Sequence, residues 1–136
     1  MSERHADLLR RALDVVWNEG DLSRAQEFYA ADVVLHGTIP GATGVEAVKQ
    51  VIAAYRAGFP DLHISIEDVV AEGDKAVDRW SWTGMHKGEF MGIPATGKQV
   101  KTSGISIVRI RDGKIVEIWG VADRLGLMQQ LGAVPS

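Results

Sequence analysis

The sequence predicts an α+β fold in which helices close one side of a curved antiparallel sheet. Apolar residues recur at helical spacing up to about residue 57, and from Leu62 onward they alternate with polar residues. Turn signals such as Asp112-Gly113 separate the later alternating segments. The chain has 136 residues, 46% of them hydrophobic, which suits a single domain over residues 1–136.

About three helices are expected before most of the sheet. The first, which Ser2 can cap, should cover residues 2–19, and a short second helix should cover 21–29. The third should cover roughly 45–57, because its apolar residues fall on one side and Gly58 follows. The helical layer should therefore be built largely from the first half of the chain.

One brief strand and four long ones are expected to form the sheet. Val33–His36 is a short apolar run, and the Gly- and Pro-rich residues 37–44 after it are typical of a loop. The long strands should run from Leu62 to the turn at Glu72-Gly73-Asp74, and over 75–86, 100–110 and 114–122. Between the middle two, residues 87–98 form an irregular, partly apolar loop that can cover a cavity mouth.

Asp123 stands where the last strand gives way to a short C-terminal helix. Its neighbours are apolar: Trp119, Val121, Leu125 and Leu127. An acid buried among them would lose water, which disfavours its charged form and suits proton transfer. Aspartate is also a preferred N-cap residue, so the position equally suits a side chain that only binds backbone N–H groups. The segment by itself leaves both roles open.

Composition and charge argue against several classes of function. The formal net charge is −3 and the basic residues are dispersed, so we expect no nucleic-acid partner. The N-terminus is typical of an amphipathic helix rather than a signal peptide, and no apolar run reaches membrane-spanning length, so we predict a cytoplasmic protein without a membrane partner. The chain has no cysteine, and its histidines lack metal-ligand spacing, so we expect carboxylate or imidazole chemistry without a metal.

Short motifs are spread in sequence along nearly the whole chain: Trp17-Asn18-Glu19-Gly20-Asp21, Phe59-Pro60-Asp61-Leu62, Arg79-Trp80, Gly84-Met85-His86-Lys87-Gly88, Gly92-Ile93-Pro94-Ala95-Thr96-Gly97-Lys98 and Glu117-x-Trp119. In this order they resemble the SnoaL-like polyketide cyclase (ester cyclase) family of the NTF2-like superfamily. The resemblance implies an NTF2-like cone, with about three N-terminal helices on a curved antiparallel sheet and a short C-terminal helix. Such a cone wraps an interior pocket.

The resemblance further implies a cyclase or isomerase-type enzyme that performs acid/base chemistry without a cofactor. The family's cyclases close a ring in a polyketide ester by intramolecular aldol condensation. Asp123 matches the acid/base residue, which takes a proton from an activated methylene carbon and later helps to protonate the aldol oxygen. The ligand would be a small hydrophobic carbonyl compound. Proteins that resemble this family commonly pair through the exposed sheet face, so a homodimer is expected.

Further side chains are candidates for the pocket. His36 could bind a substrate oxygen or assist proton transfer, or it could end its strand with backbone or water partners. His86 could border the pocket or hold its own loop by hydrogen bonds. Trp119 should share the face of Asp123 and could stack on a planar ligand. The other wall residues expected are Trp17, Phe59, Met91 and Leu127.

Two alternatives to a cyclase are open. One is a non-catalytic module that binds small hydrophobic ligands, and an exposed Asp123 that only caps its helix would favour it. The other, ranked lower, is an epoxide hydrolase; Asp78 and Arg79 are adjacent on a strand and therefore point to opposite faces. The strand 104–110 offers few polar residues, so one acid with few polar partners is expected. His5 and His63 are expected at the surface without a role.

Overall fold

A five-stranded sheet organises the computed structural model, which describes residues 2–36 and 43–134. The strands are β1 (Tyr29–His36), β2 (His63–Glu72), β3 (Lys75–Met85), β4 (Gln99–Arg111) and β5 (Lys114–Ala122). They lie side by side in the order β1-β5-β4-β3-β2. The predicted α+β fold is confirmed, and the long strands begin and end within about two residues of their predicted limits.

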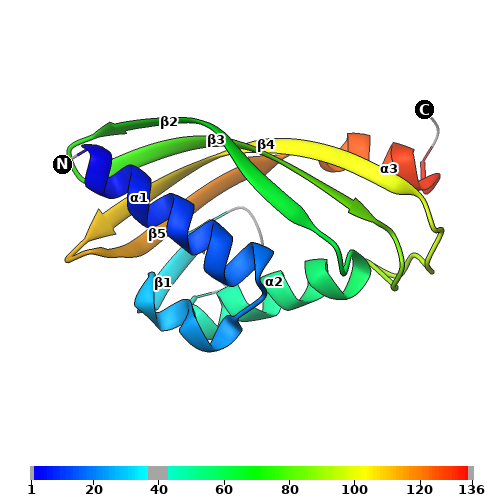
Figure 1. Ribbon diagram of the computed structural model, residues 1–136, viewed down its shortest axis with the longest axis horizontal. Coiled ribbons are helices and arrows are strands. Elements are labelled where there is room, and N and C mark those ends of the chain that lie inside the picture. The colour runs from blue at the N-terminus through cyan, green and yellow to red at the C-terminus, as the bar shows by residue number, and fades with distance from the viewer. Residues whose placement is uncertain (1, 37–42, 135–136) are drawn as a thin grey trace.

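The helical layer lies on one face of this sheet (Figure 1). It consists of α1 (Ser2–Ala12), the π-helical η1 (Leu13–Asn18), the short 3-10 helix η2 (Leu22–Glu27) and α2 (Val45–Gly58); α3 (Arg124–Leu131) follows the last strand. Gly20, with φ +73°, ends the first helical stretch. Arg56 of α2 fixes that end, because its Nη1 donates to the backbone oxygen of Trp17 at 2.7 Å.

Strands β2 to β5 are antiparallel, as predicted, but the edge strand β1 is parallel to β5. Its pairing brings His36 opposite Trp119. A parallel neighbour needs a long crossover connection, which α2 and the three intervening strands supply. Strand β1 also starts earlier than the predicted Val33, because Tyr29 already pairs with Ile115. Most of the predicted 37–44 loop, residues 37–42, lies outside the described residues.

The two faces of the sheet differ in their contacts. Side chains of even-numbered residues on β3 and β4 face the helices, and many of them are buried, such as Ala76, Trp82 and Val108. The opposite, outer face carries exposed apolar side chains, including Val70, Ile105 and Ile107. The inner face therefore supplies the core, and it is also where a ligand cavity can form.

Two further observations concern the periphery of the fold. His5, expected at the surface, is instead buried, because α1 packs across β2 and β3. His63 is exposed, as expected. Among the described residues, no helix has both the length and the apolar character needed to cross a membrane.

Candidate functional site

A cavity of about 540 Å³ lies between the helices and the inner face of the sheet. Aromatic side chains form much of its wall: Trp17, Tyr55, Trp80 and Trp82. Aliphatic side chains of α1, α2 and the inner sheet face complete it. Burial of apolar ligand surface in such a site contributes roughly 25 cal/mol per Å². The cavity therefore suits a small hydrophobic molecule.

One row of residues across the floor of this cavity carries two polar side chains. Asp78 on β3 lies directly opposite Ser106 on β4, and Ser106 lies opposite Gly120 on β5. All three line the cavity. The Trp80 indole N–H donates to Ser106 Oγ at 3.0 Å. Because Oγ already accepts this bond, the proton of the Ser106 hydroxyl is available for donation to Asp78.

Asp78 is buried, with only 4% of its surface exposed, and its Oδ1 has no hydrogen-bond partner among the described residues. Burial raises the pKa of Asp78 to about 6, although hydrogen bonds from its own backbone and from Ser106 oppose the rise. Tyr29 also lines the cavity, and burial, together with the Asp78 carboxylate, raises its pKa to about 12. The floor thus carries a carboxyl group that titrates near neutrality and has an unused oxygen.

Asp123 is exposed and caps α3. Its Oδ1 accepts a hydrogen bond of 2.9 Å from the backbone N–H of Gly126. The expected loss of water around this carboxylate is therefore not present, because Asp123 lies beyond the end of β5 rather than under the apolar side chains. It borders a small hollow next to the main cavity, and its neighbours Ala122 and Arg124 line both spaces. Asp123 consequently lies beside one end of the cavity.

The other predicted wall residues divide between the cavity region and the core. Trp17 lines the main cavity, and Met91 and Leu127 line the small hollow beside Asp123. Phe59 is fully buried against Trp82 and Phe90, so it belongs to the core.

His86 is also fully buried and holds its loop in place. Its Nδ1 lies 2.9 Å from Thr96 Oγ1 and accepts a hydrogen bond of 3.2 Å from the Thr96 backbone N–H. These contacts match the loop-holding role that the sequence left open. The His86 ring therefore belongs to the packing between the loop and the Phe59 core.

His36 and Trp119 lie on the outer face of the sheet, away from the cavity. Their rings stack with centroids 5.0 Å apart and an interplanar angle of 7°, and His36 Nε2 is 2.7 Å from Glu117 Oε2. The prediction that Trp119 shares the face of Asp123 is wrong, because the alternation ends at Ala122 and does not extend to Asp123. Neither ring lies with Asp78 on the inner face.

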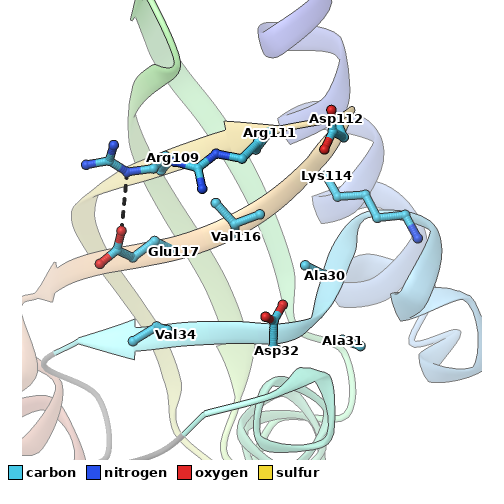
Figure 2. A pocket seen from close by; sticks show the side chains of 10 residues that line it. All are labelled: Ala30, Ala31, Asp32, Val34, Arg109, Arg111, Asp112, Lys114, Val116 and Glu117. Atoms are coloured by element: carbon cyan, nitrogen blue, oxygen red, sulfur yellow. Dashed lines mark ion pairs between the residues drawn. The ribbon is translucent and has the colours of Figure 1, made fainter.

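An outer groove of about 690 Å³ runs beside this stacked pair, between β1 and the β4–β5 hairpin (Figure 2). Charged side chains form much of its lining: Asp32, Arg109, Arg111, Asp112, Lys114 and Glu117. Arg109 Nε is 3.3 Å from Glu117 Oε1. A groove lined largely by charged side chains offers an apolar ligand little surface to bury. The inner cavity is therefore the better candidate site, although its volume is smaller.

Sequence reasoning missed Asp78 as a site residue and predicted a single acid. The signal was available, since Asp78 has the same parity as Ala76, Trp80 and Trp82, whose shared face is apolar. Arg79 points to the face opposite that of Asp78, as predicted; this is the outer face, where its Nε donates to Asp68 Oδ2 at 2.7 Å. Within residues 2–36 and 43–134, no three His, Asp or Glu side chains gather in a group that could hold a metal ion.

Comparisons with known proteins agree on the fold. A family model described as SnoaL-like polyketide cyclase matches residues 7–131. Aklanonic acid methyl ester cyclase DnrD of Streptomyces peucetius is 28% identical over 130 residues, which cover 93% of this chain and 89% of DnrD. The structure of TsrD from Streptomyces laurentii has a TM-score of 0.90 and 30% identity, covering 98% of both chains. IdmH from Streptomyces antibioticus has a TM-score of 0.80 and 34% identity, over 93% of this chain and 97% of IdmH.

Proposed function

Because the chain belongs to the SnoaL-like polyketide cyclase family, we propose that it closes a ring in a small hydrophobic carbonyl compound by an intramolecular aldol-type reaction without a cofactor. The observation that carries the proposal is the inner cavity, whose wall is apolar and aromatic and whose polar groups are few. Such a wall excludes water from a reacting enolate and holds a planar molecule by aromatic contact. The related DnrD, named as a cyclase of aklanonic acid methyl ester, supports this substrate class.

Asp123 is the proposed proton-transfer residue. It takes a proton from the activated methylene carbon, the carbanion attacks the carbonyl carbon, and the proton returns to the new alkoxide oxygen. Its place beside Ala122 and Arg124, which both line the cavity, supports access from that end. The Gly126 bond to Oδ1 fixes the orientation of the carboxylate. No step requires a metal or a redox cofactor.

Asparagine at position 123 gives a clean test, because Asn is as good an N-cap residue as Asp but cannot act as the base. Wild type and Asp123→Asn would be incubated with aklanonic acid methyl ester, and a ring-closed product of unchanged mass would be followed by liquid chromatography with mass spectrometry. We expect a rate loss of roughly 10²- to 10⁴-fold in the variant. Equal rates in the two proteins would refute the role of Asp123.

A second function is favoured by one observation: Asp123 is exposed and already serves as a helix cap. In that case the protein is a non-catalytic module that binds the same class of hydrophobic molecule. Binding of the ester without any product from wild type, under conditions in which DnrD turns it over, would favour the module over the enzyme.

A further inference from the structure

The part of the cavity that the proposed reaction does not use is the buried carboxyl of Asp78. On an apolar face a carboxylate is costly, since each buried polar group needs a hydrogen-bond partner. One side of this carboxyl interacts with its own backbone and with Ser106. Oδ1 has no partner among the described residues, although Asp78 lines a cavity with room for a ligand. Asp78 Oδ1 is therefore a hydrogen-bond acceptor for which the described residues supply no donor.

The groups around Asp78 favour its ionised form, which accepts hydrogen bonds, over its protonated form, which can donate one. Ser106 is supplied with a hydrogen bond by Trp80, which leaves the Ser106 hydroxyl proton for Asp78. Backbone and hydroxyl donors of this kind stabilise the ionised carboxyl group. An ionised carboxyl group has only acceptor capacity, so the complementary ligand group is a hydrogen-bond donor. In the proposed class of carbonyl compounds, that donor is the O–H of an enol or a phenol.

We propose that Asp78 is a substrate-recognition residue that accepts a hydrogen bond from an acidic hydroxyl, a phenol or an enol, on a ring system buried in the cavity. The inference rests on the proposed function only for the substrate class, a hydrophobic carbonyl compound whose enol or phenol hydroxyl would be the donor. It adds a polar anchor at the cavity floor, on β3, to the base at the end of β5. Substrates that lack the hydroxyl leave Oδ1 unsatisfied and bind less tightly.

Two probes of nearly the same shape test this: 2-naphthol, which has a hydroxyl, and its methyl ether 2-methoxynaphthalene, which has none. Equilibrium dialysis gives both dissociation constants for wild type and for Asp78→Leu, at pH 5 and pH 7.5. Leucine matches aspartate in shape and removes the acceptor. At pH 7.5 we expect the preference for 2-naphthol, taken as the ratio of the two constants, to be at least roughly tenfold greater in wild type than in Asp78→Leu.

The pH profile separates recognition from a merely structural effect. Asp78 is ionised above about pH 6, so the wild-type preference should be large at pH 7.5 and small at pH 5. It should be flat in Asp78→Leu. The other ionisable groups that line the cavity in the described part of the chain are Tyr29, Tyr55 and Arg124, and His5 is buried on α1, which packs on β3. All four are present in both proteins, so the comparison removes their contribution.

Asp78→Asn keeps the inference testable if the leucine variant fails to fold. Its amide oxygen still accepts the hydroxyl but carries no charge, so the preference should be intermediate and independent of pH. The inference is overturned if the ratio is the same in wild type and variants, or if wild type binds neither probe. A wild-type preference for 2-naphthol that is larger at pH 5 than at pH 7.5 would also overturn it, because the protonated rather than the ionised carboxyl group would then recognise the hydroxyl.

Failure here is distinguishable from failure of the proposed function. Turnover of the ester by wild type and its loss in Asp123→Asn test the reaction, and they involve neither probe. The probe preference tests Asp78, and it involves no turnover. A protein that cyclises the ester but shows no probe preference keeps the proposed function and loses this inference.

Discussion

Asp78 lies directly opposite Ser106 on the neighbouring strands β3 and β4, so a buried carboxyl group and a hydroxyl group share one row of the cavity floor. The Trp80 indole N–H holds the Ser106 hydroxyl at 3.0 Å. Burial in a largely apolar wall disfavours the ionised form of the Asp78 carboxyl group, whereas the neighbouring hydrogen-bond donors favour it. The two effects therefore oppose each other at this row.

The unfolding free energy should depend on pH through Asp78. Its pKa is raised from 3.8 to about 6 in the folded state, so between these values the folded protein binds more protons than the unfolded chain. The associated stability is fully present below about pH 3.8 and is lost as the pH rises through about 6. Asp78→Asn cannot titrate, so its stability relative to wild type should rise between pH 4 and pH 7 by on the order of 3 kcal/mol.

Urea denaturation of both proteins across this range measures the difference. Asp68→Asn is the control, because Asp68 is an exposed carboxylate on the adjacent strand. Its stability relative to wild type should change by less than about 1 kcal/mol. A flat difference for Asp78→Asn would mean that Asp78 is solvated in solution.

Removing the cap at Asp123 should weaken α3. Asp123→Ala leaves the Gly126 N–H without its partner and should lower the unfolding free energy by about 1 kcal/mol. Asp123→Asn and Asp123→Ser supply another cap oxygen and should lie within about 0.5 kcal/mol of wild type. Thermal and urea unfolding check the order, and an alanine variant as stable as the asparagine variant would contradict the cap.

Two glycines on the inner face of the sheet should respond differently to alanine. A Cβ at Gly104 would come within 2.3 Å of Trp80 Cζ2 and 2.5 Å of the Val121 backbone oxygen, so Gly104→Ala should cost about 1–3 kcal/mol. A Cβ at Gly120 comes no closer than 3.7 Å, to Ser106 Oγ, so Gly120→Ala should fold normally. Because Gly120 lines the cavity, its variant should instead weaken binding of 2-naphthol. Equal unfolding free energies for the two variants would be the contrary result.

We propose that the outer face of the sheet is the interface of a homodimer. Val70, Val77, Ile107 and Trp119 form one row across β2, β3, β4 and β5, and Val70 and Ile107 are exposed. Exposed apolar rows of this kind are typical of protein interfaces. Sedimentation equilibrium at micromolar concentration should give a dimer for wild type and a monomer for Ile107→Lys, with Leu125→Lys on α3 as the exposed apolar control. A monomeric wild type would end the proposal.

Much of the fold could be predicted from the sequence because its signals are local. The alternation in β2 to β5 and the Asp112-Gly113 turn each depend on residues close together in the chain. The parallel pairing of β1 with β5 could not be predicted in this way. This pairing depends on contacts between strands that are far apart in the sequence. A short apolar run such as β1 contains no information about which strand it pairs with.

The site was harder to predict, for physical reasons visible at particular residues. Parity within a strand correctly separates Asp78 from Arg79 but fails for Asp123, which lies one residue beyond β5. The outward position of His36 depends on its pairing with Trp119 across two strands far apart in sequence. Asp78 could have been found from the strand pattern alone, as a single charge on an apolar face.

A crystal structure of the protein with 2-naphthol at pH 7.5 would show directly whether Asp78 binds the hydroxyl of a ring system in the inner cavity. We expect the two rings to lie between the helical layer and the inner face of the sheet, against Trp80 and Trp82. We expect the hydroxyl oxygen to lie within hydrogen-bond distance of Asp78 Oδ1, about 2.5–3.0 Å. Rings bound in the charged groove of β1, β4 and β5, or a hydroxyl turned away from Asp78 inside the cavity, would contradict this expectation.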